Sequence, residues 1–310
     1  MRKILVITGP TAVGKSKLAV LIAKDLDGEI ISCDSMQIYK KLNIGSAKIT
    51  EEEMGGVEHH LINIISPFDS FNASNFKELC TLKINEIFQS GKVPILTGGT
   101  MMYIDSVIKD YDFTKTCNDY EYRSYLVNLA DEKGREYVHS LLKEKDKISY
   151  DSIPYNNLKR VIRALEVYKL TGKSISEFKK INEQNLNFYD HEYIILNMDR
   201  EKLYGRINER VDKMLQDGLI DEVMELKKSG LSILNQSMQG IGYKEVLDYL
   251  DKKIHYDAMV ELIKKRSRNY AKRQLTWFRR VKNSQWVNIE KHGDIYQLKK
   301  KIIDLYNGLA

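Results

Sequence analysis

The sequence predicts an α/β fold in which a parallel sheet is flanked by helices, with a helical insertion and a helical C-terminal region. Short β-branched runs alternate with stretches of helical periodicity near the N-terminus, which is the pattern of a parallel sheet with right-handed crossovers. The strand pattern then disappears over a long charged stretch and returns once, near Tyr193. We therefore predict a core over residues 1–113, a helical insertion over 114–190, and a return to the sheet followed by C-terminal helices over 191–310.

Four apolar runs account for the predicted strands. They indicate buried parallel strands because they are short and rich in β-branched residues. The four runs are Ile4–Thr8, Glu29–Cys33, Val93–Leu96 and Tyr193–Met198. Helices are predicted where apolar residues recur at helical spacing, first over Leu18–Leu26 and then over Phe76–Phe88. After about Glu201 the pattern is helical.

The composition is that of a globular protein that needs no covalent staple. Charged residues make up 30% and hydrophobic residues 43% of the 310 residues, and the formal net charge is +6. Cys33, Cys80 and Cys117 are far apart and form no CxxC pair, which excludes a disulfide framework and the common zinc spacings. His59 and His60 have no third ligand at metal spacing, so packing or hydrogen bonding is the better interpretation. No apolar run is long enough to span a membrane, and we expect a cytoplasmic monomer.

A phosphate-binding loop is the strongest motif. Residues 9–16 read GPTAVGKS, which fits GxxxxGK[ST], and they lie between a predicted strand and a predicted helix, as this motif requires. The backbone N–H groups of such a loop bind phosphate oxygens, the lysine adds a positive charge, and the hydroxyl can hold Mg²⁺. The predicted phosphate-binding residues are Gly9, Pro10, Thr11, Ala12, Val13, Gly14, Lys15 and Ser16, with Ser16 as the magnesium ligand. The core is thus similar to that of the P-loop NTPases.

Two further strand ends carry polar residues. Asp34 follows the second predicted strand, at the edge where parallel sheets bind ligands, so its carboxylate can accept a proton or help to hold a metal. A turn or helix-capping aspartate is the alternative. The third strand runs into Thr97, Gly98, Gly99 and Thr100, where many P-loop enzymes have an aspartate, which argues against an ordinary ATPase or GTPase. Thr100 can hydrogen-bond a ligand there, or the segment is only a tight turn.

Positive charge concentrates near the C-terminus. Residues 263–282 contain nine basic residues and no acidic one, and Lys265, Arg268 and Lys272 share one face of the predicted helix. A nucleic-acid backbone is the natural partner of such a stripe, whereas a solvated helix face usually carries both signs. A smaller basic cluster that includes Arg160 lies on a predicted helix of the insertion, and it is a second candidate for RNA contact.

Together these segments resemble the bacterial tRNA dimethylallyltransferases, also called tRNA isopentenyltransferases. The resemblance follows the chain in order from residue 9 to about residue 280. The phosphate loop is shared with many families, but two segments are specific: DSMQIYK, which begins at Asp34, and RNYAKRQLTWF, which begins at Arg268. The chain departs from the family at Met101 and Met102, where Gly-Leu is common, and this change removes no proposed catalytic group.

The resemblance implies an enzyme that transfers a dimethylallyl group from dimethylallyl diphosphate to N6 of the adenine 3′ of the anticodon, in tRNAs that read codons beginning with U. The phosphate loop would hold the diphosphate with Mg²⁺, and Arg206 would help to bind it. Asp34 matches the proposed general base. The implied catalytic residues are Asp34, Thr100, Lys15 and Ser16. The expected tRNA contacts, by resemblance or by charge, are Asp34, Ser35, Met36, Gln37, Thr100, Arg123, Arg160, Lys265, Arg268 and Lys272.

Two other functions stay open at this point. A P-loop kinase of a small metabolite would fit the first strands but would leave the basic C-terminal helix unexplained. A non-catalytic RNA-binding protein would use the phosphate loop only for regulation. The three functions differ in their expected reaction: prenyl transfer to RNA, consumption of ATP without modification of RNA, or RNA binding without a reaction.

Overall fold

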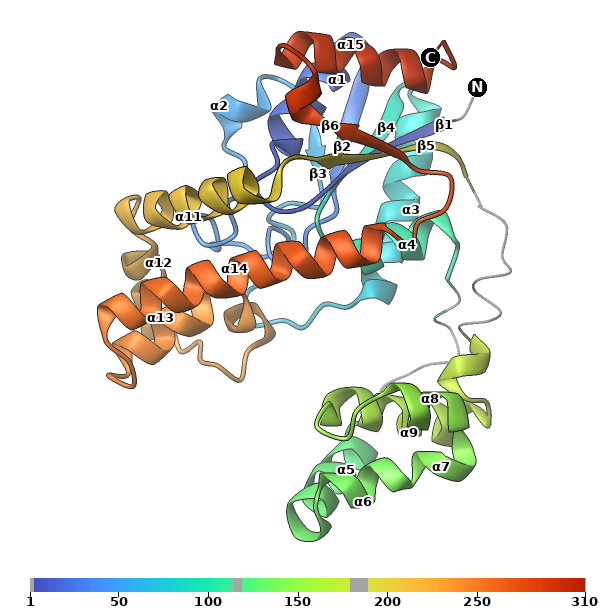
Figure 1. The fold of residues 1–310 in the computed structure, drawn as a ribbon, viewed down its shortest axis with the longest axis vertical. Coiled ribbons are helices and arrows are strands. Elements are labelled where there is room, and N and C mark those ends of the chain that lie inside the picture. Colours follow the sequence, from blue (N-terminus) through green and yellow to red (C-terminus); the bar gives the residue numbers. More distant parts are fainter. Residues whose placement is uncertain (1–2, 112, 114–118, 179–188, 310) are drawn as a thin grey trace. The chain divides into compact units, whose positions relative to one another are not determined.

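The sheet is fully parallel. In this computed structural model, which describes residues 3–111, 113, 119–178 and 189–309, six strands lie in the order β3-β2-β4-β1-β5-β6 (Figure 1). All neighbouring strands pair in parallel, which confirms the predicted fold class. The strands are β1 (Lys3–Thr8), β2 (Gly28–Ser32), β3 (His59–His60), β4 (Val93–Gly98), β5 (Asp190–Asn197) and β6 (Gln285–Asn288).

The four predicted strands are the central ones, and the two edge strands were missed. Continuous apolar runs such as Ile4–Ile7 are fully buried, because helices cover both faces of the sheet. β3 has only two residues, and β6 buries Val287 but exposes Trp286, so neither contains an apolar run that signals a strand. Edge strands of this kind depend on the neighbouring strand more than on their own sequence.

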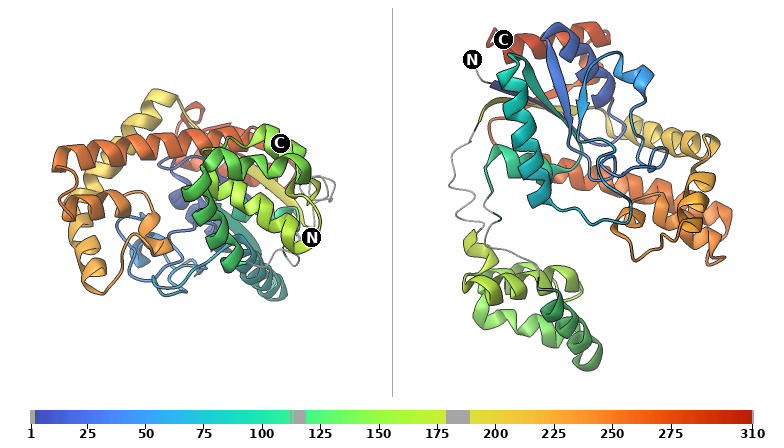
Figure 2. Two further views of the ribbon diagram at one scale, coloured as in Figure 1. Left: turned by 90° about the horizontal axis from the view of Figure 1, so that it is seen from below. Right: turned by 180° about the vertical axis from the view of Figure 1, so that it is seen from behind.

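The direction of the chain decides which helix covers which face. α1 (Lys15–Asp25) connects β1 to β2, and α3 (Ala73–Gln89) connects β3 to β4. These two connections cross the sheet in opposite directions, so right-handed crossovers place the two helices on opposite faces. Both helices were predicted. α15 (Ile295–Tyr306) packs beside α1, and the two share a buried apolar cluster with β1 and β5 (Figures 1 and 2).

Helices dominate the chain after β5, as predicted. They are α11 (Arg200–Gln216), α12 (Leu219–Lys228), α13 (Tyr243–Leu250) and α14 (Tyr256–Phe278), and the shorter elements of this unit are α2 (Glu51–Met54), α4 (Met101–Ile108), η1 (Gln236–Gln239) and η2 (Ile289–Lys291). Phe278 is buried at the end of α14, and the indole Nε1 of Trp277 donates a hydrogen bond of 3.0 Å to Asp105 in α4. Within the described ranges, no helix combines the length and apolar character needed to cross a membrane.

Internal contacts divide the chain into two units. One comprises Met1–Val107 and Tyr189–Ala310, and the other is Ile108–Phe188. The described helices of the second unit are α5 (Tyr120–Lys133), α6 (Arg135–Ser140), α7 (Leu142–Lys145), α8 (Lys147–Ser152) and α9 (Leu158–Thr171). The sequence assigns residues 114–190 to a helical insertion, of which 114–118, including Cys117, and 179–188 lie outside the described residues.

A buried carboxylate joins α5 to α9 inside the second unit. Glu166 is fully buried and accepts hydrogen bonds from Arg123 Nε and Nη2 at 2.8 and 2.9 Å. Arg163 Nη1 and the N–H of Asp119 donate to the same carboxylate at 2.5 and 2.8 Å. Burial alone would raise the pKa of Glu166, but the hydrogen bonds from Arg123 and Arg163 outweigh it and lower the pKa. Arg123, which the sequence assigns to tRNA contact, therefore also has a structural function.

Replacing Glu166 with Ala should destabilise the second unit by about 3–5 kcal/mol, because two arginines lose their buried partner. Hydrogen exchange of α5 and α9 in the full chain measures this, and Glu132→Ala, at an exposed position of α5, is the matched control. Because the pKa of Glu166 is lowered on folding, its contribution is present above the ordinary value of 4.5 and is lost as the pH falls below it. Equal protection in both variants would contradict the assignment.

Candidate active site

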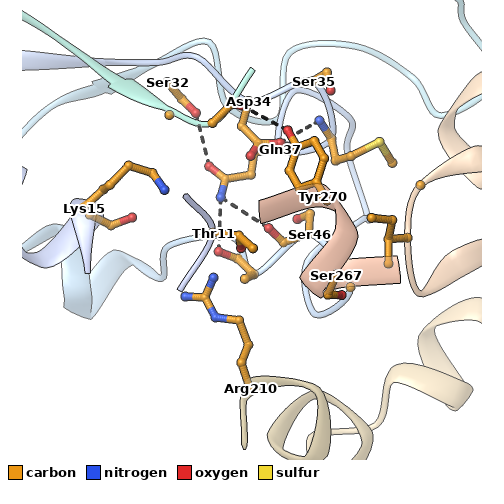
Figure 3. A pocket seen from close by; sticks show the side chains of 18 of the residues that line it. Thr11, Lys15, Ser32, Asp34, Ser35, Gln37, Ser46, Arg210, Ser267 and Tyr270 are labelled. Atoms are coloured by element: carbon orange, nitrogen blue, oxygen red, sulfur yellow. Dashed lines mark hydrogen bonds between the residues drawn. The ribbon is translucent and has the colours of Figure 1, made fainter. Parts of the chain in front are cut away.

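The carboxyl ends of β1, β2 and β4 open into one cavity of about 430 Å³. Parallel sheets bind ligands at this edge. Its walls come from the phosphate loop, the turn after β2, the loop around Ser46, and helices α11 and α14 (Figure 3). The predicted residues that line it are Thr11, Lys15, Ser16, Asp34, Ser35, Met36 and Gln37.

The phosphate loop takes its shape from its glycines and its lysine. Gly9 has φ of 150°, and a Cβ there would lie 2.5 Å from the carbonyl oxygen of Leu196, so a side chain does not fit. Lys15 Nζ donates hydrogen bonds to the carbonyl oxygens of Gly9 and Pro10 at 3.0 and 2.9 Å. α1 begins after Gly14 without a side-chain cap, so its first N–H groups are available to an anion.

Cationic side chains from three elements line the cavity together with the carboxylate of Asp34, and they are Lys15, Arg210 and Arg273. Figure 3 shows Lys15, Arg210 and Asp34 directed toward the same space. Burial, and to a smaller extent the charge of Arg210, lower the pKa of Lys15 to about 7, while Asp34 acts in the opposite direction. Loss of hydration and the nearby charge of Arg210 both disfavour the protonated form of Lys15. A bound phosphate carries the opposite charge and would therefore stabilise the protonated lysine.

Two arginines line the cavity, Arg210 of α11 and Arg273 of α14, and neither was predicted from the sequence as a site residue. Arg206, the predicted diphosphate ligand, precedes Arg210 by one turn of α11 and is absent from the cavity lining. The nearest polar contact of Arg206 is a weak one, from Nη1 to Met198 Sδ at 3.8 Å. Arg206 and Arg210 are four residues apart, so they lie on about the same face of α11, one turn apart along its axis. The position of α11 along its axis, fixed by burial of Leu203, Ile207 and Val211, decides which arginine reaches the cavity.

Asp34 forms a turn, and its geometry is also compatible with the ligand-binding role predicted from the sequence. Its Oδ1 accepts hydrogen bonds from the N–H groups of Met36 and Gln37 at 2.8 and 3.3 Å, which is a turn-forming role. Its Oδ2 accepts no hydrogen bond from the part of the chain that the structure describes, and the residue lines the cavity. One oxygen is thus fixed by the backbone while the other is available to a ligand.

Thr100 supports the turn that carries Asp34 but does not line the cavity. Its Oγ1 accepts a hydrogen bond from the N–H of Ser35 at 3.0 Å, and its own N–H donates to the carbonyl of Cys33 at 3.0 Å. A Cβ on Gly98 would lie 2.2 Å from that carbonyl oxygen, so the glycine lets β4 approach the turn. The tight-turn interpretation of the TGGT segment therefore applies here, whereas a hydrogen bond from Thr100 to a ligand stays a prediction.

Two side chains fix the loop that forms the far wall. Gln37 Nε2 donates to the carbonyls of Ser46 and Ala47 at 3.3 and 3.1 Å, and its Oε1 accepts from Ser32 at 3.1 Å (Figure 3). Glu222 of α12 accepts from three successive N–H groups, those of residues 43, 44 and 45, at 2.9, 2.8 and 3.1 Å. The amide of Gln37 is therefore used to hold the wall.

α14 is attached directly to the phosphate loop. Gln274, which is 1% exposed, accepts from the N–H of Thr11 at 2.9 Å and donates to the carbonyl of Gly99 at 2.9 Å. The hydroxyl of Tyr270 donates to the same carbonyl at 3.0 Å. The sequence analysis missed these residues, although Ser267, Tyr270 and Gln274 recur at helical spacing as an uncharged face within the basic stretch.

Several cations of α14 have partners within the protein. Lys264 pairs with Asp212 at 2.7 Å, and Arg268 donates to Asn208 at 2.6 Å, both on α11. Arg266 pairs with Glu245, a buried residue of α13. Arg268, a predicted tRNA contact, is thus partly engaged in packing α14 on α11.

The predicted stripe does not face the cavity. Lys265 and Lys272 are exposed. At about 100° per residue they lie roughly half a turn around α14 from Tyr270 and Gln274, which line the cavity. Any RNA that contacts the stripe does so on the outer side of the helix.

Arg160, His59 and His60 complete the set of residues that the sequence singled out. Arg160 is exposed on α9, in the second unit. His60 Nε2 makes a hydrogen bond of 2.7 Å with Glu29, which also pairs with Lys92 at 2.7 Å. His59 Nδ1 makes one of 2.8 Å with the carbonyl of residue 57. The histidines are thus hydrogen-bonded, as the sequence interpretation expects.

The residues present are compatible with Mg²⁺. The hydroxyl of Ser16 and the carboxylate of Asp34 line the same cavity, next to the phosphate loop. Magnesium is commonly held by one or two protein oxygens together with substrate phosphates and water, and this donor set is of that kind.

Comparisons with known proteins agree with the resemblance. A sequence profile of the family described as IPP transferase matches residues 37–281. The full-length tRNA isopentenylpyrophosphate transferase of Bacillus halodurans is 41% identical, with 100% of this chain and 98% of that one covered and a TM-score of 0.74. The tRNA delta(2)-isopentenylpyrophosphate transferase of Staphylococcus epidermidis is also 41% identical, with 99% of each chain covered and a TM-score of 0.73. A eukaryotic dimethylallyltransferase acting on tRNA is 30% identical, with 93% of this chain and 74% of that one covered and a TM-score of 0.79.

Gln274→Glu should weaken diphosphate binding by about ten-fold, because a carboxylate oxygen would replace the donor facing the Gly99 carbonyl and disturb the phosphate loop. Calorimetric titration with inorganic diphosphate measures the affinity. Gln89→Glu, the same charge change at an exposed position of α3, is the control. Unchanged affinity in a folded Gln274→Glu protein would show that this contact does not shape the loop.

Proposed function

The chain belongs to the IPP transferase family, and we propose that it transfers a dimethylallyl group from dimethylallyl diphosphate to a tRNA. The observation that carries the proposal is one cavity shared by a phosphate loop and Asp34, in a chain whose relatives act on tRNA. The proposed acceptor is N6 of adenine 37, 3′ of the anticodon, in tRNAs that read codons beginning with U. A cytoplasmic location and a monomeric state stay predictions from the sequence.

The proposed base is Asp34. As the bond between N6 and the first prenyl carbon forms and the bond from that carbon to the diphosphate breaks, the proton on N6 passes to Asp34 Oδ2. Oδ1 is already held by two backbone N–H groups, so the carboxylate has a fixed orientation before the substrate binds. Adenine in a single-stranded loop leaves its stack at a cost of only a few kcal/mol.

The departing diphosphate gains negative charge, and the phosphate loop is suited to receive it. The N–H groups at the start of α1, together with Lys15 and Arg210, supply positive charge in a cavity partly shielded from water. Ser16 would hold Mg²⁺, which when bound supplies further charge neutralisation to the diphosphate and leaves Asp34 Oδ2 to act as the base. Thr100 acts on the reaction through Ser35, by holding the turn that carries the base.

The proposed contacts with tRNA extend beyond the reacting base. The segment from Asp34 to Gln37 would surround the flipped-out adenine. Arg123 and Arg160 of the second unit would contact the anticodon stem-loop. Arg123 keeps this proposed role alongside its ion pair with Glu166.

The decisive experiment incubates the protein with dimethylallyl diphosphate, ATP, Mg²⁺ and an anticodon stem-loop, and weighs the RNA by mass spectrometry. A mass gain of one prenyl unit, located at adenine 37 by fragmentation, is the expected result. ATP consumption without RNA modification would instead indicate a kinase. RNA binding without either reaction would indicate a binding protein.

Asp34→Ala should reduce transfer by at least about 100-fold, since general-base catalysis contributes roughly that much. Affinity for tRNA, measured by filter binding, should change little. Glu58→Ala, at an exposed acidic residue beside β3, serves as the control. Turnover retained in the Asp34 variant would rule out the general-base role.

Arg210→Gln should raise the KM for dimethylallyl diphosphate more than Arg206→Gln does. The reason is geometric, because Arg210 lines the cavity and Arg206 does not. A loss of about ten-fold is expected for one charge-assisted contact to phosphate. Steady-state kinetics at saturating tRNA measures both variants, and the reverse order would contradict the assignment of Arg210 to the diphosphate.

A further inference from the structure

The outer side of α14 carries a charged surface that the active site does not use. Lys265, Lys272 and Arg279 are all exposed and lie on one face of the helix. Within the described residues, none of the three makes an ion pair or a side-chain hydrogen bond, in contrast to Lys264 and Arg266, which have acidic partners. We call these three residues the outer stripe. Unpaired like charges on one face favour an anionic partner.

A second cavity lies at the C-terminal end of the outer stripe. It has a volume of about 360 Å³ and is distinct from the active-site cavity, with which it shares no lining residue. Its lining residues are Asn197, Met198, Arg200, Leu203, Leu275, Arg279 and Trp286. Arg279 therefore belongs both to the outer stripe and to this cavity, so the two form one continuous surface.

Trp286 gives this cavity an aromatic wall. Its indole is 40% exposed on edge strand β6, whereas the next residue, Val287, is buried on the other face of the sheet. Arg200, at the start of α11, lines the same cavity, and its Nε donates to the Tyr204 hydroxyl at 3.2 Å. An exposed tryptophan that shares a cavity with two arginines is suited to stack a nucleobase and bind its phosphate.

We propose that the outer stripe and the Trp286 cavity form a second RNA-binding surface, which holds part of the tRNA away from the reacting base. The proposal rests on the proposed function in taking tRNA as the RNA. The length of the surface favours RNA over a free nucleotide. Lys265, Lys272 and Arg279 follow one another at intervals of seven positions. Neighbouring cations are therefore about 10 Å apart along the helix, and the three span roughly 21 Å. One mononucleotide does not reach all three, but a polynucleotide backbone does.

The first test measures how tRNA affinity depends on salt. Replacing Lys265, Lys272 and Arg279 together with Ala should lower the slope of log Kd against log[KCl] by about 2–3, since each lost phosphate contact removes about one. Lys291, Lys300 and Lys301 are exposed cations on η2 and α15, and their triple Ala variant is the matched control. A similar change in both variants would mean that total charge alone matters, and would overturn the proposal.

The second test uses the fluorescence of Trp286. The chain has two tryptophans, and Trp277 is held by Asp105, so iodide should quench mainly Trp286. Bound tRNA should protect this signal, AMP at the same nucleotide concentration should not, and Trp286→Phe should remove the protected component. Trp286→Ala should weaken tRNA binding by about five-fold or more. Equal protection by AMP would assign the cavity to a free nucleotide, and no protection by tRNA would rule out contact.

Both tests are done without the prenyl donor, so they separate this proposal from the proposed function. If prenyl transfer fails but the outer-stripe variant still loses salt dependence, the surface remains an RNA site and the enzymatic proposal is wrong. If transfer succeeds and both the outer-stripe variant and Trp286→Ala bind tRNA like the unmodified protein, only the proposal of a second RNA-binding surface is wrong.

Discussion

All six strands run in one direction, so the residues that follow β1, β2 and β4 meet at one edge of the sheet whatever their separation in the chain. This constraint puts the phosphate loop beside Asp34 and the TGGT segment. It also requires helices on both faces. A further helix, α14, contributes Gln274 to the phosphate loop. The parallel direction of the strands therefore brings the site residues together, and the chemistry of their side chains determines what the site can bind.

Much of the polar chemistry around the cavity is structural. Thr100 holds the turn at Ser35, Gln37 holds the loop at Ser46, and Glu222 gathers three backbone N–H groups. A buried N–H or carbonyl group without a hydrogen-bond partner lowers the stability of the folded protein by about 1–3 kcal/mol. The loops that line the cavity lack the regular hydrogen bonds of helices and sheets, so side chains must supply these partners. They leave Asp34 Oδ2, Lys15, Arg210 and the start of α1 as groups available to a ligand.

The positive charges illustrate how residues of one type serve different purposes. Arg266 and Arg123 neutralise buried carboxylates, whereas Lys265 and Lys272 remain exposed without an acidic partner in the described ranges. A buried carboxylate loses its hydration and must recover the energy from a cation, which an exposed one need not do. Net charge alone does not distinguish these cases, because the distinction depends on which carboxylates are buried nearby.

The sequence by itself determined the fold class, the four central strands, the phosphate loop and the position of Asp34 at a strand end, because local periodicity and the motif encode them. Tertiary structure decided that Arg210 rather than Arg206 enters the cavity, that Gln274 binds the phosphate loop, and that the basic stripe points outward. The first outcome depends on the position of α11 along its axis, and the other two depend on the rotation of α14 about its axis. Both the position and the rotation are set by which apolar side chains pack against the rest of the core, and no local pattern of charged residues records them.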